Sequence, residues 1–207
     1  MRILACGSRG VVTLFFLSLC LLASPALAQD QQNHPLGGFI DEVKLGVLAH
    51  DIDLFAANPK ENGVAINTEI LFVNLPFADA KRPAWLNFIL TPRPAIGGSI
   101  STNGGTSFGY FGANWELTYA RRIINPNDSL FGSFEFGAAF NDAPSSGFHP
   151  DREVMGSTAD FHLAAELGYR FDKHFSASLY YEHISNADLA SPNPGINNAG
   201  VRFGYKF

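Results

Sequence analysis

Apolar and polar residues alternate along most of the chain, and the alternation is interrupted by clusters of Asn, Pro, Gly and Asp. A period of two places successive side chains on opposite faces of a β-strand. The pattern predicts eight strands, over residues 42–50, 64–72, 85–99, 111–119, 130–140, 161–171, 175–185 and 201–207. Pro92 and Pro94 interrupt the third range, so this strand is expected to bend or to end early.

One face of these strands is rich in aromatic and aliphatic residues, and the other carries charged residues of both signs. The charged set is Lys44, Glu69, Arg93, Glu116, Glu135, Glu166, Arg170, Glu182, Arg202 and Lys206. An eight-stranded barrel is narrow enough for side chains to fill its interior. We therefore predict that these charges pair inside the barrel and that the aromatic face contacts lipid. A lipocalin-like soluble barrel shows the same alternation with its faces reversed, so alternation alone does not separate the two.

The first 28 residues have the features of a secretory signal peptide. Arg2 and Arg9 precede an apolar stretch, 11–23, and Ala26 and Ala28 supply the small residues of a cleavage site. The apolar stretch is shorter than a membrane-spanning helix requires. Cys20 suggests a lipoprotein signal, but Leu19 stands where a small residue should precede the lipidated cysteine.

No long apolar run follows the signal, and a membrane protein without helices must be a closed barrel. The last five residues alternate aromatics, Phe203, Tyr205 and Phe207, which resembles the final-strand signal that the outer-membrane barrel-assembly machinery reads. The predicted fold class is all-β: residues 29–207 form a single domain, an eight-stranded antiparallel transmembrane β-barrel of the cell outer membrane.

Composition and charge narrow the function classes. Both cysteines leave with the signal, so the mature chain has no disulfide and no thiol nucleophile. Arg2 and Arg9 leave as well, and the formal net charge moves from −5 to −7, which argues against nucleic acid as a partner. The histidines outside the 180–187 stretch show no metal-ligand spacing. We expect neither a metal nor a cofactor.

The stretch Tyr180-Tyr181-Glu182-His183-Ile184-Ser185-Asn186-Ala187 carries the candidate chemistry. His183 and Ser185 are two residues apart on a predicted strand and share its lipid-facing side, whereas Glu182 faces the lumen. A serine hydroxyl becomes a nucleophile when a histidine takes its proton. The pair lies at the outer end of the seventh strand, where lipopolysaccharide fills the outer leaflet. The spacing alone is also consistent with a rim histidine beside a loop serine.

His183-Ile184-Ser185-Asn186-Ala187, followed by Pro192-Asn193-Pro194-Gly195, resembles the signature of the outer-membrane lipid A 3-O-deacylase family (PagL type). The resemblance implies an eight-stranded barrel with its catalytic site on the outer wall. The implied reaction is hydrolysis of the ester-linked acyl chain at the 3 position of lipid A. By position, His183 matches the general base, Ser185 the nucleophile and Asn186 the oxyanion donor.

The third member of the catalytic triad departs from the family pattern. The family places a glutamate fourteen residues after the histidine, and here that position is Asn197. A carboxylate orients the histidine and stabilises its charged form, whereas an amide can only orient it. Three alternatives follow: Asn197 orients His183 in a slower enzyme, Asp188 swings in as the acid, or the chain is a non-catalytic relative. Glu182 is a poor substitute because it lies on the opposite face.

The sequence therefore favours a lipid A 3-O-deacylase-like esterase whose partners are lipopolysaccharide lipid A and the outer membrane. The alternative is a non-catalytic structural or interaction barrel of the outer membrane. A solute channel is disfavoured because charged side chains are expected to fill the lumen. The sequence leaves open whether two copies form a homodimer.

Overall fold

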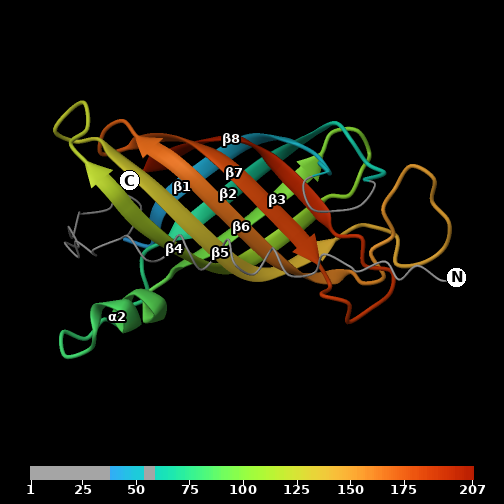
Figure 1. The fold of residues 1–207 in the computed structure, drawn as a ribbon, viewed down its shortest axis with the longest axis horizontal. Helices are drawn as coiled ribbons and strands as arrows, with labels where there is room; N and C mark the ends of the chain where they lie inside the picture. The colour runs from blue at the N-terminus through green and yellow to red at the C-terminus, as the bar shows by residue number, and fades with distance from the viewer. Residues whose placement is uncertain (1–37, 54–58) are drawn as a thin grey trace, which may run out of the picture.

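The computed structural model describes residues 38–53 and 59–207, which form one closed barrel (Figure 1). Each strand pairs antiparallel with the next along the chain, and β8 pairs with β1 to close the barrel. The strands are β1 (Ile40–Ala49), β2 (Val64–Phe72), β3 (Arg93–Ser101), β4 (Phe108–Arg121), β5 (Ser129–Asn141), β6 (Ala159–Arg170), β7 (Phe175–Ser185) and β8 (Ile196–Lys206). The predicted eight-stranded antiparallel barrel is confirmed. The expected signal peptide, 1–28, lies outside the described residues.

Most strand bounds lie within a few residues of the prediction, and those of β2 and β7 coincide with it. The exception among the strands with a clear pattern is β8, which begins at Ile196 rather than at residue 201. Asn197 and Asn198 interrupt the apolar alternation at this point, although both side chains are fully buried. This early start matters because it places Asn197 on a strand, opposite His183.

The predicted strand over residues 85–99 is wrong in its first part, where Ala84–Leu90 form the helix α2. Pro83 has a φ of −56°, which suits the start of a helix, and its carbonyl accepts the Leu86 N–H at 3.1 Å. Pro92 ends the helix because the residue before a proline is disfavoured in helical conformation. The indole N–H of Trp115 donates to the Ile89 carbonyl at 3.1 Å, which joins α2 to the outside of β4. No helix among the described residues is long and apolar enough to cross a membrane.

The two faces of the barrel wall have opposite character. Outward-facing residues with exposed apolar side chains include Leu45, Val47, Ile66, Ile70, Ile96, Phe111, Phe136, Leu167, Leu179, Val201 and Phe203. Buried charged residues that face the lumen include Glu42, Lys44, Glu69, Arg93, Glu135, Glu166, Arg170, Glu182 and Arg202. A soluble barrel needs the reverse arrangement, so the structure is that of a membrane barrel.

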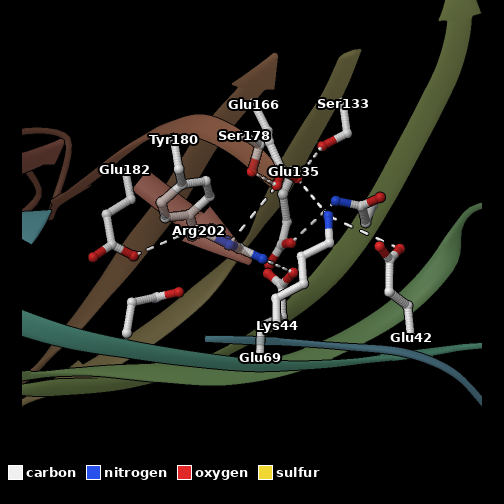
Figure 2. A network of polar contacts seen from close by, with 12 residues as sticks. Glu42, Lys44, Glu69, Ser133, Glu135, Glu166, Ser178, Tyr180, Glu182 and Arg202 are labelled. Atoms are coloured by element: carbon white, nitrogen blue, oxygen red, sulfur yellow. Dashed lines mark hydrogen bonds and ion pairs between the residues drawn. The ribbon is translucent and has the colours of Figure 1, made fainter. Parts of the chain in front are cut away.

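The charges in the lumen pair with one another (Figure 2). Lys44 Nζ lies 2.5 Å from Glu166 Oε2. Arg202 donates to Glu69, and its guanidinium stacks 3.9 Å from the centroid of the Tyr180 ring. Burying single charges in this space would be costly, and pairing offsets the lost hydration. The predicted internal network of mixed charges is confirmed, and its side chains occupy the space that a channel would need.

The two ends of the barrel differ in their connections. The loops β1–β2, β3–β4, β5–β6 and β7–β8 gather at one end (Figure 1). The other end carries α2, the C-terminus and the short turns between β4 and β5 and between β6 and β7. In outer-membrane barrels the short turns face the periplasm and the longer loops face outside. The end of β7 that carries His183 and Ser185 therefore lies at the outer face.

Candidate active site

His183 and Ser185 lie at the outer end of β7 and point away from the lumen. Their neighbours Glu182 and Ile184 are fully buried inside the barrel, so the strand alternates as predicted. The β7–β8 register places Asn197 directly opposite His183. Three residues that the sequence separates by as many as fourteen positions thus meet on one patch of the outer wall.

These three side chains form a continuous hydrogen-bonded line. His183 Nδ1 lies 2.8 Å from Asn197 Oδ1, and His183 Nε2 lies 3.0 Å from Ser185 Oγ. An amide oxygen can only accept, so Nδ1 carries the ring proton and Nε2 is free to accept from the serine hydroxyl. This is the tautomer that a general base requires. The predicted association of His183, Ser185 and Asn197 is present in the structure.

A fourth residue, Tyr181, joins this line. Its hydroxyl donates to Asn197 Oδ1 at 2.6 Å, so this oxygen is placed between Tyr181 and His183. The amide nitrogen of Asn197 is buried and has no hydrogen-bond partner within the described ranges. The site residues predicted from the sequence do not include Tyr181. The spacing could have pointed to it, because residues 181, 183 and 185 share one face of the strand.

The Asn186 side chain hydrogen-bonds to its own β7–β8 loop and to Met155 in the β5–β6 loop. Its Nδ2 donates to the carbonyls of Met155 at 2.7 Å and Pro192 at 3.3 Å, and its Oδ1 accepts the Ala190 N–H at 3.3 Å. The side chain is buried. The structure therefore places this amide in the network that shapes the loop, and its donation to an ester oxygen stays a prediction.

The two other carboxylates near the site do not contact His183. Asp188 accepts a hydrogen bond from Asn193 Nδ2 at 3.1 Å, and its backbone has a φ of +62°. Glu182 is fully buried in the lumen, where it accepts from Asn198 Nδ2 at 2.8 Å. Asn197, rather than either carboxylate, thus contacts His183 Nδ1, and Glu182 lies on the opposite face as the sequence predicted.

Gly195 brings the β7–β8 loop close to His183. It has a φ of +72°, and a Cβ built there would lie 2.8 Å from His183 Cε1. Any other residue would be strained in this backbone conformation, and its side chain would press on the imidazole. Both effects favour glycine at this position. The loop therefore limits the positions that the ring can adopt.

The surface around Ser185 is apolar. Phe161 lies opposite Ser185 in the β6–β7 register, and its ring stacks on Phe136 with centroids 6.1 Å apart. Leu179, further along β7, is 64% exposed. An activated serine in this setting can attack an ester that approaches sideways from the lipid phase, without passing through the lumen.

Comparisons with known proteins identify the family of the chain. The family model described as "Lipid A 3-O-deacylase (PagL)" matches residues 87–206, which is more than half of the chain. A search of curated proteins finds no match. The crystal structure of the outer-membrane enzyme PagL is similar, with a TM-score of 0.56 and 16% identity, over 80% of this chain and 99% of that one.

A second solved structure is less similar. The N-terminal β-barrel domain of Pseudomonas aeruginosa OprF has a TM-score of 0.44 and 13% identity, over 82% of this chain and 99% of that one. The family match covers β3 to β8 and the loops between them, which include every residue of the candidate site. The chain is an outer-membrane β-barrel and belongs to the lipid A 3-O-deacylase (PagL) family.

Proposed function

We propose that this protein is an esterase that hydrolyses the acyl chain ester-linked at the 3 position of lipid A in the outer leaflet. Ser185 is the nucleophile, His183 the general base and Asn197 the residue that orients His183. The observation that supports this most strongly is the line from Ser185 Oγ to His183 Nε2 and from His183 Nδ1 to Asn197 Oδ1, with contacts of 3.0 and 2.8 Å. The line lies on the lipid-facing side of β7.

The reaction proceeds in two steps. His183 Nε2 takes the hydroxyl proton as Ser185 Oγ bonds to the ester carbonyl carbon. The carbon–oxygen bond to the sugar then breaks, and the sugar 3-oxygen takes that proton from His183. A water molecule, deprotonated by His183, next attacks the acyl-serine. The bond between the acyl carbon and Ser185 Oγ breaks, Oγ takes the proton back from His183, and the fatty acid is released. No cofactor enters either step.

Asn197 fixes the direction of the imidazole but adds no charge. During attack the imidazole becomes positively charged, and a carboxylate at position 197 would stabilise that charge electrostatically. The amide dipole does so more weakly, so we expect a slower enzyme than a relative with a glutamate there. The competing function, a non-catalytic barrel, is favoured by this same missing charge.

Activity on purified lipopolysaccharide separates the two functions. Refolded wild-type protein should release a 3-hydroxy fatty acid, and Ser185→Ala should abolish the release, because removing a catalytic serine costs many orders of magnitude in rate. Ser146→Ala, an exposed serine of the β5–β6 loop, is the matched control and should keep the wild-type rate. Release by Ser185→Ala at the wild-type rate would refute the serine assignment. No release by the wild type on several lipopolysaccharides would favour the non-catalytic barrel.

We also propose that residues 1–28 direct export and that the terminal aromatics of β8 are read by the barrel-assembly machinery. Phe203 is 65% exposed on the lipid face, and the Tyr205 ring packs edge-on against Phe207 with centroids 5.1 Å apart. Replacing Phe207 by Ala should lower the amount of folded protein in the outer membrane.

Analytical ultracentrifugation in detergent tests whether two copies form a homodimer.

A further inference from the structure

A buried histidine outside the proposed catalytic line joins the outer loops to the start of β8. His50 directly follows β1 and is only 3% exposed. Its Nδ1 lies 2.9 Å from Asn198 Oδ1, and its Nε2 lies 2.8 Å from Glu61 Oε2. Asn198 is the immediate neighbour of Asn197. His50 therefore contacts the residue next to the one that orients His183.

Glu61 connects His50 to two further loops. Its carboxylate accepts from the backbone N–H of Thr106 at 2.5 Å, from the Thr106 hydroxyl at 2.8 Å and from the backbone N–H of Glu153 at 2.8 Å. Burial alone would raise the pKa of Glu61, but the hydrogen bonds from His50, Thr106 and the Glu153 N–H outweigh it and hold the pKa at about 2. Glu61 is thus ionised at neutral pH and is a strong acceptor for His50.

The first residues of β8 lack a strand on one side. Pairing between β1 and β8 stops at Ala49 and Ala199, so Asn197 and Asn198 pair only with β7. The segment after β1 takes the place of the missing strand. The Ile52 N–H donates to the Asn197 carbonyl at 2.8 Å, and the Asp51 N–H donates to Asn198 Oδ1 at 3.1 Å. The His50 side chain adds its own contact with Asn198 to these two hydrogen bonds.

Consecutive residues of a strand point to opposite faces. Fixing the Asn198 side chain on the lumen side and the Asn197 carbonyl along the strand therefore also fixes where the Asn197 side chain points. A carboxylate would attract His183 over a range of directions, because charge attraction is only weakly directional. The neutral amide of Asn197 depends on hydrogen-bond geometry, which weakens steeply with misalignment.

We propose that His50 is a positioning residue of the esterase, which acts through Asn198 to hold Asn197 Oδ1 against His183 Nδ1. This inference rests on the proposed function. His50 contacts neither the substrate nor the reacting atoms in this account. From the lumen side of the barrel wall, His50 thus controls the orientation of the His183 ring.

The test compares His50→Ala in two backgrounds. In the protein with Asn197, His50→Ala should lower kcat about tenfold, because the group that orients His183 is no longer held in place. KM should stay unchanged, because His50 does not contact the substrate. In an Asn197→Ala background the same change should lower kcat less than about twofold, because the group that His50 positions is gone. His174→Ala is the matched control, since this exposed histidine lies at the other end of the barrel. Its Nδ1 lies 2.7 Å from the carbonyl oxygen of Lys206. It should change neither constant.

An equal loss of kcat in both backgrounds would overturn the proposal, because a merely structural histidine costs the same with or without Asn197. A rise in KM alone would overturn it as well. The folded state of each variant is verified by its heat-modifiable migration in gel electrophoresis. If His50→Ala does not fold, His50→Gln, which keeps one N–H donor, carries the same comparison between backgrounds.

A second readout keeps this proposal separate from the proposed function. In wild-type protein, ¹⁵N NMR of the His183 ring should show a proton on Nδ1 and none on Nε2, and His50→Ala should give averaged signals from both tautomers. If the wild type hydrolyses no lipopolysaccharide but the tautomer depends on His50, the proposed function fails and the positioning role stands. A single tautomer in both proteins would refute the positioning role even in an active enzyme.

Discussion

His183 and Asn197 face each other across β7 and β8, and Nδ1 of the first lies 2.8 Å from Oδ1 of the second. The amide stands where the family pattern has a glutamate. Asn197 therefore has the hydrogen-bond geometry of the third residue of a catalytic triad but lacks the negative charge of a carboxylate.

Asn197→Glu should raise kcat by about ten- to a hundredfold, because a carboxylate stabilises the imidazolium that forms during attack. The rate of fatty acid release from lipopolysaccharide measures the effect. Asn197→Gln is the matched control, since it has the length of glutamate without the charge. A gain in the glutamine variant equal to that in the glutamate variant would show that length, rather than charge, limits the enzyme.

Tyr181→Phe should lower kcat by about fivefold at an unchanged KM, because it removes one hydrogen bond of roughly 1 kcal/mol that holds Asn197 Oδ1. Steady-state kinetics on a soluble ester in detergent gives both constants. Tyr205→Phe, on the lipid face near the C-terminus, should have no effect. If the two phenylalanine variants behave alike, the Tyr181 hydroxyl has no part in orienting the site.

Gly195→Ala should lower kcat at least about tenfold, because the new methyl group meets His183 Cε1 and turns the imidazole away from Ser185. Gly104→Ala is a closely matched control. Gly104 has a φ of +78°, close to the +72° of Gly195, but a Cβ built there meets nothing within 4 Å. Both variants carry similar backbone strain, so only contact with His183 distinguishes them. Equal losses of activity would contradict a role for this close approach.

Asp51→Asn should stabilise the outer loops at high pH and not at low pH. Burial, together with the nearby carboxylates of Glu153 and Glu61, raises the pKa of Asp51 from 3.8 to about 6. A carboxyl whose pKa is raised by folding stabilises the fold below its unfolded pKa and loses that contribution as pH rises through 6. Asparagine stays neutral at every pH and tolerates the φ of +49° found at this position.

Urea unfolding in detergent micelles at about pH 8 and about pH 4 measures this difference. The midpoint for Asp51→Asn should exceed the wild-type midpoint at the higher pH and match it at the lower. Asp53→Asn, an exposed residue of the same loop, is the control and should change neither midpoint. A gain that is the same at both pH values would mean that the ionisation of Asp51 is not its source.

The sequence predicts the barrel well because each strand repeats the same local pattern. The bounds of β7, on which the candidate site depends, coincide with the predicted range 175–185, although the polarity of the two faces reverses at Ile184 and Ser185. The error at α2 has a local cause, since Pro83 and Pro92 enclose a short apolar run that fits either a helix or a strand. Alternation alone did not reveal the early start of β8, because Asn197 and Asn198 are buried polar residues.

The contacts around the site were harder to predict than the site itself. His183 and Ser185 are neighbours on one strand, so spacing alone brings them together. His50 and Asn198 lie 148 residues apart, and their contact depends on how β1 and β8 close the barrel. The Asn186 amide bonds to Met155 in another loop, which no local pattern encodes.

The most direct test of the central claim is the mass of lipid A recovered after incubation of lipopolysaccharide with wild-type protein and with Ser185→Ala. The account predicts that the wild type yields lipid A lacking the acyl chain at the 3 position and that Ser185→Ala yields intact lipid A. Loss of the same acyl chain with Ser185→Ala, or of none with an equally folded wild type, would contradict it.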